Sequence, residues 1–315
     1  MRTKLSFNTI TLLTIPPLLW SANAIIGRLI YHDIPPVTLN FLRWLCAFAI
    51  LLPFTYPIFR SNSGLWRDAK QYAMLGLLGI GLYNALQYAA LQSSGPINVT
   101  LVASGMPVWM MLIGYLFFGA QVRLRQIAGA ALSITGVLFV LSRGKLTHLL
   151  GLHLVAGDLL MIAATIAWSF YSWLLTDQNR YQELRARWAF FLMAQISFGV
   201  LWSGMFAAAE LTLTQHDIIW SWKLIAAILF VAIGPALIAF RCWGAGVQQA
   251  GPNIAGFFVN LTPLFTTMLS AAILGELPDW YHGIAFLLII AGIIISSRQS
   301  KPSAPQVNST STSQN

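Results

Sequence analysis

Polar side chains interrupt an otherwise apolar stretch at Tyr83, Asn84, Gln87 and Tyr88. In a helix, Asn84, Gln87 and Tyr88 share one face, with Tyr83 beside it. Amide and hydroxyl groups in this arrangement can hydrogen-bond a small polar solute. They can also join two helices, which in a membrane contributes about 0.6–2 kcal/mol per bond. As a group, they favour the wall of a polar cavity.

Two tryptophans, Trp20 and Trp168, lie near the middle of apolar stretches. Membrane tryptophans are usually enriched at the ends of such stretches instead. Their rings can pack against neighbouring helices, or form a stacking surface for an apolar or aromatic substrate with an amine over the ring face. The candidate substrate-binding residues therefore also include the following: Trp20, Trp168, Tyr171, Asn23 and Asn260.

Two cations, Arg43 and Arg241, also fall within apolar stretches. Ionisable residues inside a membrane are costly, so each suggests a function. One interpretation is that the long side chain reaches back to the membrane surface. The other is a contact with a substrate carboxylate, and the sequence leaves both open.

Carboxylates are placed differently from these cations. No Asp or Glu falls near the middle of an apolar stretch, and Asp158 and Glu276 stand at stretch ends. Acids near a helix N-terminus are favourable, so these two are interpreted as helix-end residues. A proton-coupled drug antiporter is expected to keep a buried carboxylate as its relay. That function is therefore the disfavoured alternative.

The residues indicate neither a catalytic centre nor a metal or cofactor site. The two cysteines, Cys46 and Cys242, lie in apolar runs, and no Cys/His metal spacing accompanies them. We find no His/Asp pair at short helical spacing and no phosphate-binding glycine loop. A polytopic membrane enzyme is thus the less favoured alternative, and we expect no catalytic residue, no metal and no cofactor.

The composition indicates that these groups are carried by helices that lie in a lipid bilayer. Of 315 residues, 57% are hydrophobic and 9% are charged, whereas soluble domains carry about 25% charged residues. A membrane span needs about 20 mostly apolar residues. The fold class predicted is an all-α polytopic membrane protein, with a disordered cytoplasmic tail at 299–315. Its ten expected spans are 8–31, 36–58, 71–92, 96–118, 125–142, 157–176, 187–209, 222–246, 253–274 and 280–297.

The first span resembles a secretory signal peptide, with Arg2 and Lys4 ahead of an apolar run that ends on Ala22-Asn23-Ala24. However, LLWSANAIIG around Trp20 has a counterpart in IAWSFYSWLL around Trp168, 148 residues later. A signal peptide would not recur in mid-chain. We therefore predict a retained first helix.

An internal repeat extends through both halves. Landmarks recur at an offset of 156 residues, including Gly95-Pro96 with Gly251-Pro252 and Pro107 with Pro263. We predict two five-helix repeats, at 1–147 and 148–298. Because five is odd, the second repeat must enter the membrane in the opposite sense to the first. Secondary transporters share this plan, with a substrate site between the repeats.

Breaker residues fall at depth within several expected spans. Proline removes a helix hydrogen bond and frees backbone carbonyls, which can line a cavity or allow bending. A simple kink is the minimal interpretation. The candidate hinge or break residues are Pro16, Pro17, Pro107, Pro235 and Pro263.

Charge predicts the orientation. With the N-terminus in the cytoplasm, twelve Lys and Arg residues fall in cytoplasmic segments and four in outer ones. Positive residues concentrate on the cytoplasmic side of membrane proteins. Both termini are therefore expected there. The net charge of +9 is explained by topology, and we expect no nucleic-acid partner.

Several stretches resemble the drug/metabolite transporter superfamily, EamA type, including its YddG-like members. They are WSANAIIGRLI, PPVTLNFLRW, YNALQYAALQ, GDLLMIAATIAWSFYSW and the run from Gly251 to Ile295. Gly119-Ala120 departs from the Gly-Glu that ends the matching helix in the second half, at Gly275-Glu276. The resemblance implies ten helices as two inverted repeats and alternating access around a cavity lined by helices 1, 3, 4, 6, 8 and 9.

The expected function follows from the repeat, the polar and aromatic set, and the resemblance. It is a secondary transporter or facilitator of small metabolites, with amino acids as the expected substrates and export as the expected direction. The expected location is a bacterial cytoplasmic (inner) membrane. The partners are a small-molecule substrate and the lipid bilayer, with a monomer compatible with the sequence.

Overall fold

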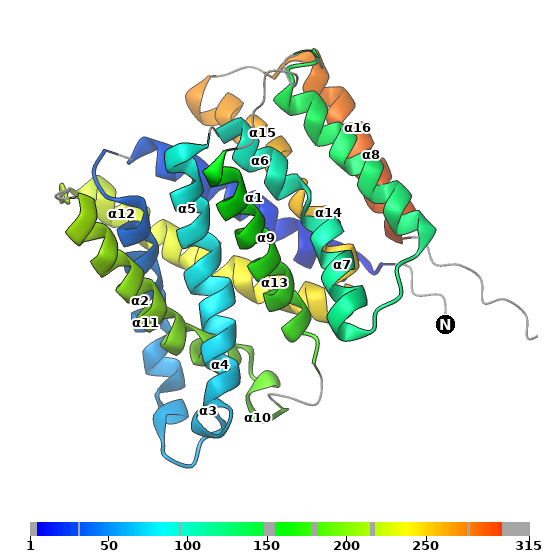
Figure 1. Ribbon diagram of the computed structural model, residues 1–315. Helices are drawn as coiled ribbons and strands as arrows, with labels where there is room; N and C mark the ends of the chain where they lie inside the picture. Colours follow the sequence, from blue (N-terminus) through cyan, green and yellow to red (C-terminus); the bar gives the residue numbers. More distant parts are fainter. Residues whose placement is uncertain are drawn as a thin grey trace, which may run out of the picture.

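The computed structural model describes residues 5–30, 32–94, 96–145, 147, 155–177, 182–214, 218–275 and 278–297. Within these ranges every regular element is helical, and no strand occurs (Figure 1). The expected cytoplasmic tail at 299–315 and the expected helix-end residue Glu276 lie outside the described residues.

The first half contains five rods, each of which is one helix or a run of consecutive helical segments. They comprise α1 (Phe7–Leu29); α2 (Pro36–Thr55), continued by the 3-10 turn η1 (Tyr56–Phe59); α4 (Ala69–Leu75), the π-helical η2 (Gly76–Leu82) and α5 (Tyr83–Ser93); α6 (Pro96–Ser104) and α7 (Met106–Phe118); and α8 (Leu124–Leu141). A short helix, α3 (Gly64–Arg67), lies in a connection.

The second half repeats this order in the described residues. It comprises α9 (Ala156–Leu174); α11 (Trp188–Thr214); α12 (Trp222–Val231), the π-helical η4 (Ala232–Ile238) and α13 (Ala239–Ala250); α14 (Pro252–Val259) and α15 (Thr262–Leu274); and α16 (Trp280–Ser297). The short α10 (Gln182–Arg185) lies in a connection.

These rods match the ten expected spans to within a few residues. Eight of the described helices are long and apolar enough to cross a membrane, and Met106–Phe118 is a shorter apolar helix. The sixth rod, α9, has 19 residues. The fold is thus an all-α bundle of two five-helix inverted repeats.

Local irregularities recur at the repeat offset. The π-helical η2 and η4 cover residues 76–82 and 232–238, positions that are 156 apart. Gly119 and Gly275 end α7 and α15 with φ of +64° and +74°. This left-handed conformation favours glycine, which has no Cβ to clash. The two halves therefore share backbone geometry as well as helix order.

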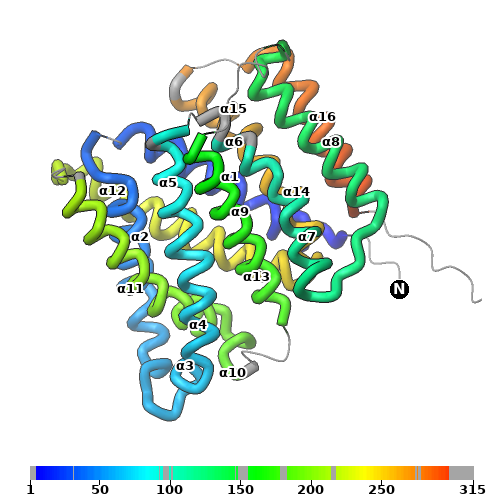
Figure 2. Tube along the Cα trace, in the orientation of Figure 1, coloured from blue at the N-terminus to red at the C-terminus, as the bar shows by residue number. Residues whose placement is uncertain are grey.

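Packing between the halves has the same symmetry (Figures 1 and 2). α8 packs along α16, and α2 packs along α11. α5 packs against α9, and the equivalent pair is α13 against α1. Exchanging the halves leaves this set of pairs unchanged. α1 is thus packed among helices of the second half.

The contact between α8 and α16 depends on glycine. A Cβ on Gly129 would lie 2.7 Å from the Gly292 carbonyl oxygen, and a Cβ on Gly292 would lie 2.7 Å from the Gly129 carbonyl oxygen. A Cβ on Gly136 would lie 2.9 Å from the carbonyl oxygen of Ala285. Ala285 and Gly292 are the repeat equivalents of Gly129 and Gly136. The same close approach is therefore made twice.

The expected proline breaks fall into three groups. Pro107 and Pro263 lie in the first turns of α7 and α15, directly after interruptions in the fourth and ninth rods. Pro235 lies within η4. Pro16 and Pro17 lie inside α1, which continues through them without interruption.

Serines of the opposite half lie at the two interruptions. The Ser21 hydroxyl in α1 donates to the Thr262 carbonyl at 2.8 Å. The Ser169 hydroxyl in α9 lies 3.7 Å from the Met106 sulfur and donates to the Thr165 carbonyl at 2.8 Å. Ser21 and Ser169 are repeat equivalents, as are Thr262 and Met106. Each interruption is therefore held by the first helix of the other half.

Two buried carboxylates cap helix N-termini. Glu210 in α11 accepts from the Val37 and Thr38 backbone N–H groups at 3.0 and 2.6 Å, and from the Thr38 hydroxyl at 2.9 Å. Asp158 accepts from the Val155 N–H at 2.9 Å and from the Ser94 hydroxyl. The first N–H groups of a helix lack partners within it, and a negative charge there is favourable.

We expect Glu210→Gln to lower the stability of the folded chain by about 1–2 kcal/mol, because the amide nitrogen cannot accept hydrogen bonds from the N-terminus of α2. Thermal unfolding of the purified protein in detergent measures the change. The control is Glu183→Gln, which removes an exposed ion pair with Arg67 at 2.9 Å. Its carboxylate also accepts one long hydrogen bond of 3.3 Å from the Gly64 N–H of the four-residue α3, which the remaining amide oxygen can still accept, so the substitution is expected to cost less than about 1 kcal/mol. Equal effects of the two substitutions would contradict the capping role.

Candidate functional site

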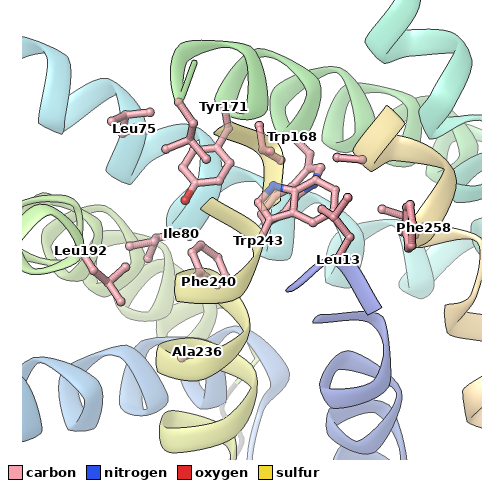
Figure 3. Close-up of a cluster of buried hydrophobic side chains, with 14 of the residues drawn as sticks. Leu13, Leu75, Ile80, Trp168, Tyr171, Leu192, Ala236, Phe240, Trp243 and Phe258 are labelled. Atoms are coloured by element: carbon pink, nitrogen blue, oxygen red, sulfur yellow. The ribbon is translucent and has the colours of Figure 1, made fainter. Parts of the chain in front are cut away.

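Aromatic side chains from both halves meet in the interior of the bundle. We call them the aromatic cluster, and Figure 3 shows four of its members, Trp168 and Tyr171 from α9 beside Phe240 and Trp243 from α13. The full cluster is Trp20, Tyr83, Trp168, Tyr171, Phe240 and Trp243.

Trp168 is the centre of the cluster. Its ring lies 5.3 Å from Trp20 in an edge-to-face arrangement, with an interplanar angle of 84°. Its distances to Tyr83 and Trp243 are 5.0 and 5.6 Å. Tilted and edge-to-face pairs at these distances are favourable for aromatic rings. The structure therefore brings together the expected aromatic residues Trp20, Tyr83, Trp168 and Tyr171.

Hydrogen bonds fix two of the rings in place. The Trp243 indole N–H donates to the Ser172 hydroxyl at 3.2 Å. The Tyr171 hydroxyl donates to the Gln195 side-chain oxygen at 3.0 Å. Gly79 in η2 is needed for this packing, because a Cβ there would lie 2.7 Å from the Tyr171 ring. These two rings of α9 and α13 are thus held in place by α9, α11 and the π-helical η2.

Most of the aromatic cluster is buried, whereas Trp20 and Tyr83 are partly exposed. Trp168 and Tyr171 are 3% and 1% exposed, and Trp243 is fully buried. A solute from outside the protein can reach the buried rings only after neighbouring helices separate.

The expected polar residues divide between the cluster and other places. Asn84 is buried on α5 next to Tyr83, and Gln87 and Tyr88 are partly buried on the same helix. Asn23 on α1 accepts a long hydrogen bond of 3.5 Å from the buried Arg43 guanidinium.

Two expected site residues lie elsewhere. The Asn260 amide donates to the Ser133 hydroxyl at 2.9 Å, which joins α8 to the interruption between α14 and α15. Arg241 is exposed, with its guanidinium 5.6 Å from the Trp188 ring centroid. The structure does not bring either residue to the aromatic cluster.

Sequence reasoning missed Phe240 and Trp243. Both lie in α13, which packs against α1. They occupy the repeat positions of Asn84 and Gln87, at the offset of 156 residues. Applying that offset to the polar candidates would have found them.

Two hollows lie away from the cluster. One, of about 270 Å³, is an apolar groove between α2 and α12, lined by Leu42, Leu45, Cys46, Ala49, Trp220, Ile225, Ile228 and Leu229. The other, of about 260 Å³, has polar walls where the α7–α8 and α13–α14 connections meet, and includes Arg123, Gln126, Trp173 and Asn253.

Charge is sparse around the cluster. In the described part of the chain, the buried acids are Asp158 and Glu210, and each caps a helix N-terminus. Among the same residues, no three His, Cys, Asp or Glu side chains gather as metal ligands would. The arrangement offers aromatic faces, amides and one buried guanidinium.

The chain matches a known family twice. Residues 8–142 and 155–298 each match the model of the EamA-like transporter family. The two matches divide the chain where the internal repeat does, and together they cover most of its length. They account for the symmetry of the fold.

Similar proteins include named transporters. The uncharacterized transporter YyaM of Bacillus subtilis is 25% identical over 79% of this chain and 79% of its own. The aromatic amino acid exporter YddG of Ancylobacter novellus is 23% identical over 70% of this chain and 74% of its own. A Salmonella typhimurium protein named "Probable amino-acid metabolite efflux pump" is 23% identical over 88% of this chain and 90% of its own.

A solved crystal structure has the same fold. It covers 91% of this chain and 96% of its own, with a TM-score of 0.71 and 21% sequence identity. At that identity, the likeness concerns the fold alone.

Proposed function

The chain belongs to the EamA-like transporter family, and on this basis we propose that it exports small metabolites, amino acids above all, across the cytoplasmic membrane. It is a multi-pass membrane protein. The proposed mechanism is facilitated or secondary transport by alternating access, in which the two repeats open a central site to one side at a time.

The aromatic cluster is the observation that carries this proposal. Its rings come from α1 and α5 in the first repeat and from α9 and α13 in the second. A site built jointly by both repeats changes its access when the repeats move against each other. Rings with few charged neighbours suit a substrate with an apolar or aromatic side chain.

The interruptions near Pro107 and Pro263 supply places where that movement can occur. Each lies in a cavity-lining rod of the expected set and is contacted by a serine of the opposite half. A helix that is already broken bends at low cost, because no further backbone hydrogen bond is lost. Together with the π-helical η2 and η4, these sites favour a rocking motion of the two halves.

The orientation follows from charge. The connections after α2, α7 and α9 and both chain ends hold most of the Lys and Arg residues, which favours their location in the cytoplasm. The polar hollow beside Arg123 and Asn253 then opens on the cytoplasmic side. This placement suits entry of a cytoplasmic metabolite and its export.

Proton-coupled drug export is the competing function. It requires a carboxylate that takes up and releases protons near the substrate. The described buried acids are both engaged at helix N-termini, and the cluster itself contains none. These contacts favour transport that needs no proton gradient.

The test is solute release from proteoliposomes that contain the full chain. The vesicles are loaded with a mixture of amino acids and common metabolites, and release is followed by mass spectrometry with and without a pH gradient. We expect selective release of amino acids at the same rate in both conditions. Protein-free vesicles are the control for leakage.

Two results would count against the proposal. Release of amino acids only under a pH gradient would replace the facilitator with a proton-coupled mechanism. Absence of release for every compound, with gradient-driven accumulation of cationic dyes instead, would favour the drug antiporter.

A further inference from the structure

Helix α2 carries an unusual polar face toward the centre of the bundle. Asn40, Arg43 and Trp44 stand at helical spacing on one side of α2. Asn40 and Trp44 are fully buried, and Arg43 is 5% exposed. This face is distinct from the helices that the family resemblance expects to line the cavity.

Each of these side chains holds a buried polar atom without a partner. In the described protein, Asn40 Oδ1, Arg43 Nε and Trp44 Nε1 have no hydrogen-bond partner. The Asn40 amide nitrogen donates to the Ile80 carbonyl at 3.3 Å, which assigns its oxygen as the free atom. Buried polar atoms are nearly always paired, and three on one helix face are a place where a polar ligand could be bound.

The guanidinium is also without a counter-ion. Its contacts are the Asn23 oxygen at 3.5 Å from Nη1 and the Trp44 ring at 5.7 Å from Cζ. Tyr88 on α5 is close enough to interact with it electrostatically. No carboxylate among the described residues pairs with it. A buried charge is normally paired, and an anion from outside the protein would satisfy this one.

The polar face adjoins the aromatic cluster on two sides. The Trp44 ring lies 4.7 Å from Phe240, edge to face at 82°. Arg43 contacts Asn23, which follows Trp20 by one turn of α1. A ligand at the polar face would therefore place its remaining atoms against Trp20, Trp168 and Phe240.

The chemistry of the three free atoms matches one class of ligand. A carboxylate accepts from Arg43 Nε and Trp44 Nε1, and an ammonium group donates to Asn40 Oδ1. We propose that α2 holds the charged main-chain groups of a zwitterionic α-amino acid, with its side chain in the aromatic cluster. This inference rests on the proposed transport function and names the substrate class of that site.

The three atoms are buried in this conformation. A ligand reaches them when α1, α2 and α13 separate, as alternating access requires. Closure around the ligand then makes three hydrogen bonds that are missing in its absence. The polar face thus couples closure to the presence of a zwitterion.

The test is ligand-induced thermal stabilisation of the full chain in detergent, because a ligand that binds only the folded state raises its midpoint. The probes are the proteinogenic L-amino acids, each beside its amide, which lacks the carboxylate, and its des-amino acid, which lacks the ammonium group. We expect an amino acid with an apolar side chain to bind at least about tenfold more tightly than either analogue, since buried polar groups reject ligands that leave them unpaired.

Variants separate binding from folding. Arg43→Gln is expected to bind an amino acid and its amide equally, and Arg43→Lys to keep part of the discrimination. Asn40→Leu is expected to bind an amino acid and its des-amino acid equally. The control Leu45→Ala, at an exposed position of α2, is expected to keep the wild-type preferences. A purely structural arginine would change the midpoint without ligand but not the preference.

The outcomes are distinct from those of the release measurement. Loss of acid-over-amide preference in Arg43→Gln supports the site. Binding of amino acids without that preference, or with it unchanged in Arg43→Gln, overturns the site while the proposed transport stands. If no amino acid stabilises the wild type, the site on α2 is wrong, and release from proteoliposomes decides on transport independently.

Discussion

Replacing Trp168 with alanine is expected to lower amino-acid release from proteoliposomes by about tenfold or more. Trp168 contacts Trp20, Tyr83, Phe240 and Trp243 at ring distances of 5.3, 5.0, 5.5 and 5.6 Å. Aromatic pairs contribute about 0.5–1.5 kcal/mol each, and about 1.4 kcal/mol of transition-state stabilisation corresponds to a tenfold change in rate. Removing the central ring removes the surface on which, in the proposed mechanism, both repeats contact the substrate.

Loss of folding must be separated from loss of transport. Truncating a buried tryptophan costs about 3–5 kcal/mol of stability, so rates are compared per unit of folded protein after size-exclusion chromatography. Trp168→Phe keeps an aromatic face and is expected to retain most of the rate. Phe170→Ala is the matched control on α9, because its ring packs on Phe117 at 5.1 Å instead of on the cluster. A wild-type rate in folded Trp168→Ala would contradict the role of the cluster.

Replacing Gly292 with leucine is expected to destabilise the bundle by about 3 kcal/mol or more, because larger side chains in a packed interface force the backbone to move. A Cβ on Gly292 would lie 2.7 Å from the Gly129 carbonyl oxygen and 3.1 Å from the Ser133 nitrogen. These are backbone atoms of α8 and cannot turn away as a flexible side chain could. Thermal unfolding in detergent and the yield of monodisperse protein measure the effect.

Gly283→Leu provides the control for this substitution. It lies on the same helix, and a Cβ there would meet no atom within 4 Å. Leucine is expected to leave the free energy of unfolding within about 0.5 kcal/mol of the wild type, as exposed substitutions usually do. If both variants unfold alike, helix propensity and not the contact between α8 and α16 determines stability.

The fold could be predicted largely from the sequence. Apolar length located the ten rods, and the offset of 156 residues from Pro107 to Pro263 located the repeat. The π-helical η2 and η4 were not predicted, since nothing in the periodicity of a π-helix of this length separates it from an α-helix. The effect of Pro16 and Pro17 was also open, because packing against α13 and α15 determines whether a helix continues through proline.

The candidate site was predicted only in part. Depth along each span singled out Trp20 and Trp168, but depth does not tell which way a side chain faces. The sequence therefore could not show that Asn260 contacts Ser133 or that Arg241 contacts Trp188. Phe240, Trp243 and the polar face of α2 depend on how helices distant in sequence pack. The repeat offset gave a signal of Phe240 and Trp243, and of the polar face only Arg43 stood out in the sequence, as a cation in an apolar stretch.

The most direct measurement is an experimental structure of the full chain with a transported amino acid bound. Its result locates the substrate without relying on rates. We predict ligand density between Trp20 and Trp168, with the carboxylate at Arg43 and the side chain toward Phe240. Density confined to the groove beside Leu45 and Trp220, or to the polar hollow beside Arg123, with none in the aromatic cluster, would contradict the central site.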